Sequence, residues 1–432
     1  MTPVPTIAVT DHVGVAEARD LLVQMVAINS STGHEIELVE FLDRWCRANS
    51  LESKIDRGSG RAGSLVVELP GAAAVESPVV LFYAPLDTAE SVDLARDAPW
   101  FGSLAELQAW REVKVQGDEV AGVGAENPKG FALATLMAMA AIKRSGTRLK
   151  GTLRIALCGS AMPTLGVDPS ELGLGTGLLR LLQRGLTADF ALSCKPGWTV
   201  AHEEVGLVWL RVRLTGRQAY VGFRHKAPYD NPIVRGGRLA AALDAWFISY
   251  AEAETSGLVA PQGIVAALRA GAPERSAFVG EACDLYLDVR VSPRRTPIEV
   301  ARLVERRVAE ELADLDPRSW SVEMIACVPP SETPESSWII RCARDAWQQL
   351  EGRDHEHIYR TSGASDTCIL RTWGIPTARV GMPLRVGKDS WVGPDGLGLN
   401  VVNVRDCARL ADLLVRTAVE TCNRSLADVL SG

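Results

Sequence analysis

The feature that most constrains the fold is a series of short apolar segments that alternate with helix-like stretches. Four such segments lie at 64–70, 78–84, 152–158 and 188–194, and helical apolar spacing occurs at 12–29, 35–50, 130–145 and 172–185. Strands that are apolar on both faces and alternate with helices are typical of a parallel sheet covered on both sides. The first part of the chain is therefore expected to be an α/β domain with a largely parallel sheet.

The pattern changes near Val205. Strand-like alternation at 207–216, 265–270, 282–291 and 321–328 is combined with helical spacing at 231–253 and 297–314. This order predicts an α+β domain whose sheet has one face toward solvent. After Pro330 the α/β pattern returns, with helices at 336–351, 365–373 and 403–424 and a strand at 376–381. We therefore expect residues 1–205 and 330–432 to form one domain, and residues 206–329 to form an inserted domain.

Charge and cysteine content exclude several classes of protein. The formal net charge is −7, from 46 Lys+Arg and 53 Asp+Glu, so an overall positive field for nucleic acid is absent. No apolar run approaches the roughly 18 residues of a membrane span, and the first residues do not resemble a signal peptide. The nine cysteines are scattered without a CxxC pair. These features predict a cytoplasmic protein without membrane or nucleic-acid partners.

Five segments carry a resemblance to one family, in the same order along the chain. They are LFYAPLDTAES at 81–91, GVGAENPKGFALATLMA at 122–138, LTGRQAYVGFRHKAPYDNPIV at 214–234, LYLDVRVSPRRTPIEV at 285–300 and SGASDTCILRTWGIPTARVG at 362–381. They resemble the di-zinc exopeptidase and amidohydrolase family that includes aminoacylase, acetylornithine deacetylase, succinyl-diaminopimelate desuccinylase and carboxypeptidase G. The resemblance implies a zinc-exopeptidase-like α/β/α domain with an inserted α+β lid, and a homodimer formed through that lid.

The positions that hold the two zinc ions in this family carry other residues here. The resemblance places the ligands and the general base at Pro85, Asp87, Asn127, Ala161, Met162, Lys195 and a position near Gly396, and the lid histidine at Tyr220. Zinc needs His, Cys or carboxylate ligands, and an alanine cannot deprotonate a metal-bound water. We therefore expect no zinc at these positions and no cofactor.

Other positions of the family's substrate site are retained. Arg290 matches the arginine that holds the substrate carboxylate, a role that suits a planar guanidinium. The resemblance adds Gly363 and Ser365 of the glycine turn, Asn127 and Asn231 as substrate-binding residues. Two points stay open. If Arg290 does not bind substrate, it is a surface charge paired with Asp288. The peptide bond between Asn127 and Pro128 is either cis or trans.

The strand ends that would carry zinc ligands present several other polar groups, namely Tyr83, Asp87, Cys158, Ser160, Cys194 and Lys195. Lys195, Asp87, Tyr220 and Cys194 are the candidate catalytic residues. A nearby ammonium lowers the pKa of a thiol, which favours Cys194 as a nucleophile. The alternative, which we favour for Cys194, places it in the core, with Lys195 neutralising Asp87.

His355 and His357 form the one close histidine pair of the sequence. On a strand they would share a face and could bind a metal. A pair that faces solvent is the interpretation we favour.

Three functions are compatible with these residues. The leading one is a metal-independent aminoacylase- or carboxypeptidase-like protein that binds a small amide or amino-acid-like substrate with a carboxylate, and acts in a small-molecule pathway. The second is a catalytically dead pseudoenzyme that serves as a binding or regulatory subunit. The third is an amide or peptide hydrolase that uses a metal site unlike the family's, or Cys194.

Overall fold

The structure, a computed structural model, describes residues 7–73, 76–90, 93–101, 104–383 and 399–430. The chain forms two compact units. Unit 1 contains Met1–His202, Thr333–His357 and Ser365–Gly432, and unit 2 contains Glu203–Glu332 and Ile358–Ala364. These divisions lie within three residues of the expected ones at 205/206 and 329/330, and the short segment 358–364 was not anticipated. Among the described residues, no helix combines the length and apolarity that crossing a membrane requires.

Unit 1 is built on a seven-stranded sheet with the strand order β1-β2-β6-β3-β7-β17-β8. The strands are β1 (Glu52–Arg57), β2 (Gly63–Leu69), β3 (Val79–Pro85), β6 (Thr152–Cys158), β7 (Phe190–Cys194), β8 (Val200–Ala201) and β17 (Thr377–Val380). The four central strands, β6, β3, β7 and β17, are parallel. Strands β1, β2 and β8 are antiparallel to their neighbours. Three of the four apolar segments, at 78–84, 152–158 and 188–194, are thus central parallel strands, as expected, whereas the segment at 64–70 is β2, which is antiparallel to both of its neighbours.

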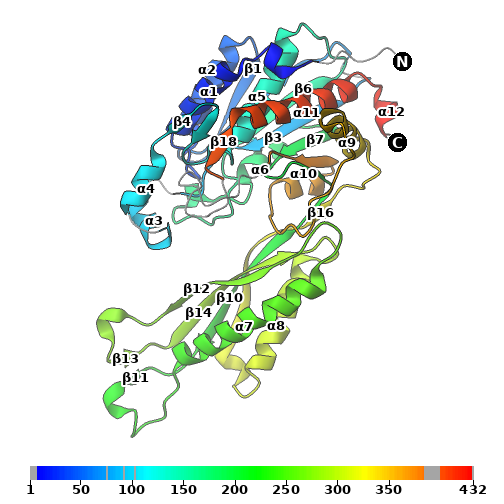
Figure 1. The fold of residues 1–432 in the computed structure, drawn as a ribbon. Coiled ribbons are helices and arrows are strands. Elements are labelled where there is room, and N and C mark those ends of the chain that lie inside the picture. The colour runs from blue at the N-terminus through cyan, green and yellow to red at the C-terminus, as the bar shows by residue number, and fades with distance from the viewer. Residues whose placement is uncertain (1–6, 74–75, 91–92, 102–103, 384–398, 431–432) are drawn as a thin grey trace. The chain divides into compact units, whose positions relative to one another are not determined.

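Helices cover both faces of this sheet, so unit 1 has three layers (Figure 1). On one face α1 (Val15–Ala27), α2 (Ile36–Ala48), α5 (Lys129–Arg144), α9 (Trp338–Glu351) and α11 (Val404–Cys422) contribute to the main hydrophobic core. On the other face α6 (Thr176–Gln183) and α10 (Thr367–Thr372) pack on a smaller core that includes Tyr83 and Cys158. Helix α5 is buried over almost its whole length, because small and apolar residues occupy nearly all of it.

The other elements of unit 1 are short. They are α3 (Leu94–Phe101), α4 (Leu104–Arg111), α12 (Leu426–Leu430) and the small sheet β18-β5-β4, formed by β18 (Val401–Asn403), β5 (Glu119–Ala121) and β4 (Lys114–Gln116).

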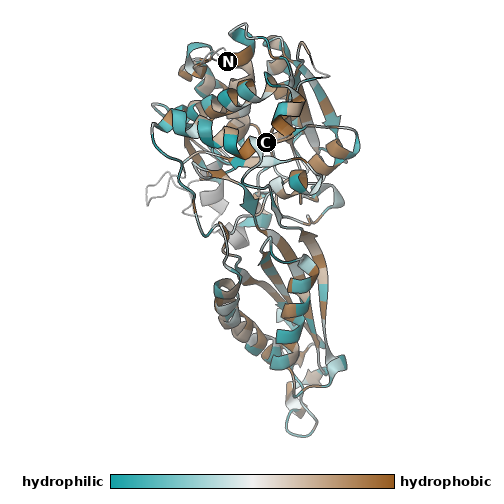
Figure 2. Cartoon of the chain, turned by 90° about the vertical axis from the view of Figure 1, so that its right-hand side faces the viewer, coloured by the Kyte–Doolittle hydropathy of each residue, from teal (hydrophilic) through white to brown (hydrophobic). Residues whose placement is uncertain are grey.

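Unit 2 contains a four-stranded antiparallel sheet with the order β12-β14-β10-β15. Its strands are β12 (Gly263–Ala270), β14 (Ala282–Val291), β10 (Gly206–Thr215) and β15 (Trp320–Val328), and α7 (Pro232–Glu254) and α8 (Pro297–Glu311) share its core. Along β14 every second residue is buried, which is the period of a strand with one covered face. Hydrophilic and hydrophobic residues alternate along these elements (Figure 2). Two small sheets complete the unit: β11 (Ala219–Tyr220) with β13 (Phe278–Val279), and β9 (Glu203–Glu204) with β16 (Ser331–Glu332).

Candidate functional site

The candidate site lies at the carboxyl ends of three neighbouring parallel strands of unit 1. Strands β3, β6 and β7 end at Pro85, Cys158 and Cys194, and the next residues lead to Asp87, Ser160 and Lys195. Because the carboxyl ends of parallel strands meet at one edge of a sheet, these segments come together although they are far apart in sequence. This edge is where open α/β sheets bind their ligands.

Asp87 is fully buried and its carboxylate accepts hydrogen bonds from three groups. The backbone amide of Ala161 lies 2.9 Å from Oδ1, the amide of Met162 lies 2.9 Å from Oδ2, and the hydroxyl of Thr32 lies 2.8 Å from Oδ2. Burial raises the pKa of Asp87, and the two amides and the hydroxyl oppose this effect. The carboxylate is therefore held by neutral donors inside the protein.

Glu35 is a second buried carboxyl group at this edge of the sheet. It accepts hydrogen bonds from the backbone amides of Gly33 at 2.7 Å, Ser160 at 2.9 Å and Gly63 at 3.3 Å. Burial, followed by the charge of Asp87, raises the pKa of Glu35 to about 7. Sequence reasoning missed this residue, because a Glu at the start of a predicted helix gives no sign that the fold buries it.

The residues at this edge do not fit the family's di-zinc centre. Pro85 offers no ligand atom, and the side chains of Ala161 and Met162 likewise lack the carboxylates that the family uses. In addition, the main chain of these last two residues donates hydrogen bonds to Asp87. Asp87 thus accepts hydrogen bonds from Ala161 and Met162, the two positions at which the family carries glutamates of its metal site.

Lys195 and Cys194 follow each other at the end of β7, but their surroundings differ. Cys194 is fully buried in the main core, and burial raises the pKa of its thiol well above its ordinary range. This position favours the core interpretation over a nucleophile. Lys195 is 9% exposed, and its backbone amide donates to Val380. Within the described part of the chain, its ammonium makes no ion pair with Asp87, so that expected pairing is wrong.

Tyr83 contacts Asp366, which with Ser365 forms the part of the glycine turn that belongs to unit 1. The hydroxyl of Tyr83, which is fully buried, donates a short hydrogen bond to Asp366, and burial raises the pKa of Tyr83 well above its ordinary range. The hydroxyl of Ser365 lies 2.9 Å from that of Thr367, which in turn donates to Ser193 on β7 at 2.7 Å. Ser365 is therefore linked to the end of β7, whereas Gly363 belongs to the short segment of unit 2.

Asn127 and Lys129 lie at the start of α5. The peptide bond between Asn127 and Pro128 is cis. The side-chain oxygen of Asn127 is buried and makes no hydrogen bond with a described residue. The ammonium of Lys129 donates to the carbonyl of Ile28 at 2.8 Å, and burial lowers its pKa to about 7. Lys129 and Glu90 line a small cavity of about 50 Å³.

The remaining predicted site residues belong to unit 2. Arg290, on β14, forms an ion pair with Asp288 in which Nε and Oδ1 are 3.0 Å apart. Its Nη2 also donates to Oδ2 of Asp288 at 3.0 Å, as the alternative interpretation proposed. Asn231 caps α7 by accepting the amide of Ile233 at 2.9 Å. Tyr220 is exposed on β11 and contacts the rings of Phe223 and Phe278.

Two further expectations concern histidine positions. The position near Gly396, where the family's late histidine was expected, lies outside the described residues. His355 and His357 do not face solvent as expected, because both are half-buried. Nε2 of His355 accepts the backbone amide of Val200 at 2.9 Å, and burial, then His357, lower the pKa of His355 to about 4. His355 is therefore a neutral acceptor inside unit 1.

The fold is that of the M20-type peptidases and amidases, which confirms the expected α/β domain with an inserted α+β lid. Human carnosine dipeptidase 1 is similar, with a TM-score of 0.71 at 13% identity over 98% of this chain and 100% of that chain. Aminopeptidase PepT from Bacillus cereus has a TM-score of 0.66 at 15% identity, over 96% and 100%. An M20 family metallo-carboxypeptidase from Sulfolobus solfataricus has a TM-score of 0.67 at 12% identity, over 94% and 99%. No family model matches the sequence.

Proposed function

We propose that this chain binds a small amide or amino-acid-like ligand with a carboxylate, at the carboxyl edge of the sheet of unit 1, without a di-zinc centre. The observation that carries the proposal is the environment of Asp87. Its carboxylate accepts backbone amides from Ala161 and Met162, the two positions where the family resemblance expects metal-site glutamates. The likeness to peptidases and amidases supports the ligand class through the fold that they share.

Lys195 is the group proposed to bind the anionic part of the ligand. Its ammonium lies at the end of β7, only 9% exposed, and forms no ion pair with a described carboxylate. A desolvated ammonium without a paired carboxylate attracts a carboxylate more strongly than an exposed one does, because the interaction is less screened. At the same edge of the sheet, Glu35 and Asp87 supply a carboxyl pair, in which the pKa of Glu35 is raised to about 7. This pair favours an acid–base step over the attack of a metal-bound water.

The pseudoenzyme function has one observation in its favour. Asp87 and Glu35 are both fully buried and hydrogen-bonded to the main chain, which is also what a purely structural carboxyl pair requires. Both the pseudoenzyme and the metal-independent enzyme would bind the ligand, but only the enzyme would convert it. The pseudoenzyme function therefore predicts that the protein binds the acid but does not convert an amide.

Unit 2 is proposed to form a homodimer with a second copy through β12. This strand lies at an edge of its sheet and pairs only with β14 among the described strands. Ile264 and Leu268 on β12 are 53% and 43% exposed, and unpaired edges with apolar side chains readily pair with another chain.

The experiment that tests ligand binding is calorimetric titration of the full-length protein with N-acetyl amino acids and with the corresponding amides of their carboxyl groups. We expect the acids to bind and the amides to bind at least tenfold more weakly, about 1.4 kcal/mol. The Lys195→Met variant should lose this preference. Equal affinity for acid and amide would contradict the proposed carboxylate site.

A further inference from the structure

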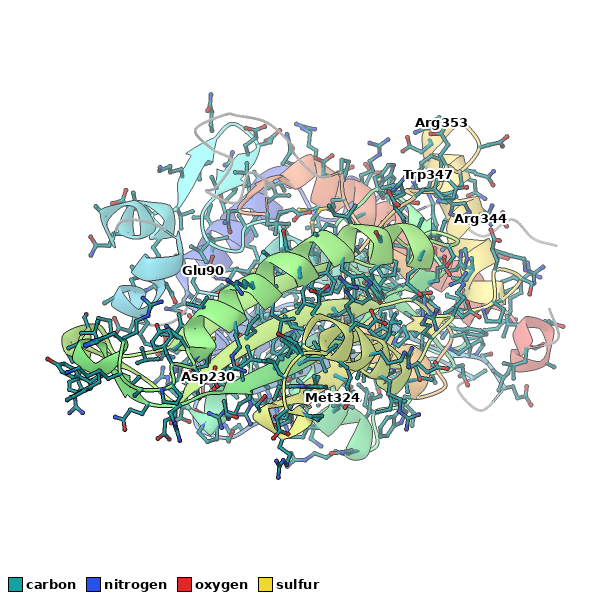
Figure 3. The ribbon with its side chains drawn as sticks, turned by 90° about the horizontal axis from the view of Figure 1, so that it is seen from below. Glu90, Asp230, Met324, Arg344, Trp347 and Arg353 are labelled. Carbon is teal, nitrogen blue, oxygen red and sulfur yellow. The ribbon has the colours of Figure 1, made fainter. Side chains whose placement is uncertain are left out.

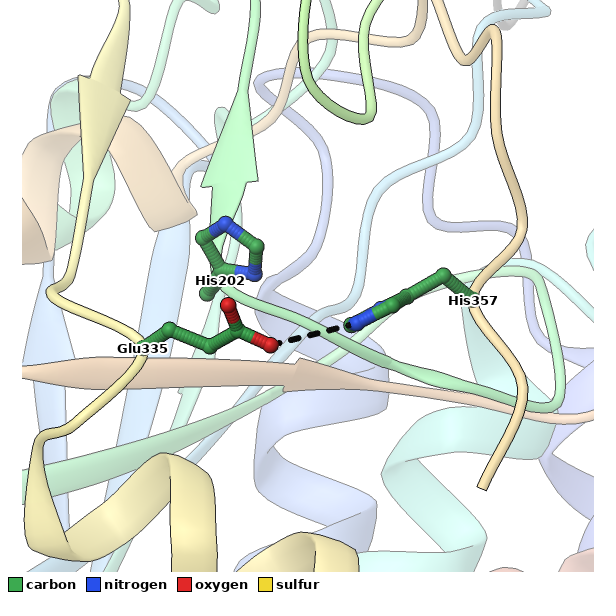
Figure 4. A group of neighbouring side chains, drawn as sticks. All are labelled: His202, Glu335 and His357. Carbon is green, nitrogen blue, oxygen red and sulfur yellow. Dashed lines mark hydrogen bonds and ion pairs between the residues drawn. The ribbon is translucent and has the colours of Figure 1, made fainter. Parts of the chain in front are cut away.

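Three side chains outside the candidate site converge within unit 1. They are His202, Glu335 and His357 (Figure 4), and the ligand atoms that they offer all lie within 4.8 Å of one another. His202 follows β8, Glu335 precedes α9, and His357 follows α9. His202 and His357 each end a segment of unit 1, and Glu335 is the third residue of the segment that His357 ends. The cluster therefore joins parts of unit 1 that are distant in sequence.

We propose that His202, Glu335 and His357 form a binding site for a divalent transition-metal ion of the Zn²⁺ class, separate from the positions of the family's di-zinc centre. Two imidazoles and one carboxylate are a ligand set that proteins use for zinc when a coordination position stays open to water. Ligands about 2.1 Å from a zinc ion at tetrahedral angles lie about 3.4 Å apart. Nε2 of His357 is 3.3 Å from Oε1 of Glu335, which is close to this spacing, and the remaining ligand atoms lie within 4.8 Å.

The surroundings of the cluster orient its two histidines. The rings of His202 and His357 meet edge to face, with their centroids 5.7 Å apart, and His355 packs on His357 in the same manner at 4.9 Å. His355 is itself held by the amide of Val200 and by the ring of Trp347, whose centroid is 5.1 Å away. Packing of this kind fixes ring orientation before a metal arrives, which lowers the entropic cost of binding.

Glu335 is half-exposed and forms an ion pair with Arg344. Nη1 of Arg344, on α9, lies 2.5 Å from Oε1 of Glu335. Figure 3 shows Arg344 and Trp347 along this helix. A glutamate carboxylate at its ordinary pKa is ionised at neutral pH, as a metal ligand must be. Arg344 adds a positive charge beside the cluster, and a metal has to compete with it for Glu335.

The experiment is calorimetric titration of chelator-treated, full-length protein with Zn²⁺ alone, followed by Co²⁺ titration in a visible spectrometer. We expect one Zn²⁺ per chain and a Co²⁺ absorption band from a protein-bound ion. His202→Ala and His357→Ala should each weaken Zn²⁺ binding by at least roughly 10- to 100-fold, since even residues that only orient a ligand have effects of this size. Arg344→Gln should strengthen it, because the competing cation is removed.

The matched control is His225→Ala, since His225 is exposed in unit 2 and should leave Zn²⁺ binding unchanged. Thermal melts without metal identify any variant that fails to fold, and Glu335→Gln then replaces it as the test of the site. Absence of Zn²⁺ binding, or binding that survives both histidine variants, would overturn the proposal. Zn²⁺ binding that survives both histidine variants but is lost in Asp87→Asn would place the metal at the sheet edge. That result would contradict the metal-independent ligand site as well. Failure of the histidine site alone can therefore be told apart from failure of the proposed function.

Discussion

Glu35 and Asp87 form a buried carboxyl pair in which burial and the charge of Asp87 raise the pKa of Glu35 to about 7. Two buried carboxyl groups that interact this strongly titrate as a pair, and below about pH 7 they hold at least one proton between them. The main chain supplies the hydrogen bonds that keep both groups in place.

The first prediction is that Glu35 makes the stability of the protein fall as pH rises. The folded pKa of about 7 lies above the ordinary value of 4.5, so the folded state binds more protons than the unfolded state between these values. The contribution of Glu35 is thus fully present below about pH 4.5 and is lost by about pH 8, on the order of 3 kcal/mol. Glu35→Gln should flatten this dependence in urea unfolding measured at pH 5 and pH 8.

The control for this measurement is Glu37→Gln, because Glu37 lies two residues further along the chain, in α2, but is exposed and ion-paired with Arg61. It should keep the wild-type slope. A slope that is the same in wild type and Glu35→Gln would show that Glu35 does not carry a raised pKa.

The second prediction concerns Lys195→Met. Because the ammonium has no ion pair with a described residue, its removal should change the free energy of unfolding by less than about 1 kcal/mol or stabilise the protein. Affinity for an N-acyl amino acid should fall by at least tenfold. A melt and a calorimetric titration of the same protein sample measure both effects. A well-folded variant with wild-type affinity and activity would remove Lys195 from the mechanism and favour the pseudoenzyme.

The third prediction separates two roles of Arg290. The alternative to Lys195 is that Arg290 receives the ligand carboxylate, and in that case Asp288 competes with the ligand for the guanidinium. Asp288→Asn should then increase affinity for the acid, and Arg290→Ala should reduce it by roughly 1.5–3 kcal/mol, the scale of a hydrogen bond to a charged group. Calorimetry on both variants is the measurement. Unchanged affinity in both would assign Arg290 to the ion pair alone.

The fourth prediction is that the edge strand β12 forms the homodimer. Charged side chains on an edge strand prevent pairing with another chain, so Ile264→Glu combined with Leu268→Glu should give a monomer. Light scattering after gel filtration measures the mass. Val167→Glu is the control, because Val167 is 83% exposed in unit 1 and should leave the mass unchanged. A wild-type protein that is itself monomeric would contradict the prediction.

Much of the fold is predictable from the sequence because burial on both faces leaves a visible pattern. The apolar segments at 78–84, 152–158 and 188–194 correspond to β3, β6 and β7, and the alternating segment at 282–291 is β14. The antiparallel edge was not predicted, because β1 has polar residues at most positions and β8 has only two residues. Such short or polar strands form only where a neighbouring strand is already in place.

The candidate site was harder to predict because its interactions depend on distant main-chain groups. Asp87 was expected to pair with Lys195, but the amides of Ala161 and Met162 satisfy its carboxylate, and amides leave no trace in a sequence. Glu35 is buried by contacts with Gly63 and Ser160, residues 28 and 125 positions away. The position of Cys194 in an apolar strand, in contrast, correctly favoured the core.

The place of β17 in the sheet determines the order in which this protein can be completed during synthesis. Strand β17 (Thr377–Val380) lies between β7 and β8, although the main segment of unit 2 is translated before it. Until residue 380 has left the ribosome, the edge of β7 has no neighbour on that side, and an unpaired edge is a site for aggregation. Unit 2 can therefore fold on the nascent chain, whereas unit 1 cannot be completed until its C-terminal segment has been synthesised. Chains that end before β17 should therefore depend on chaperones to stay in solution.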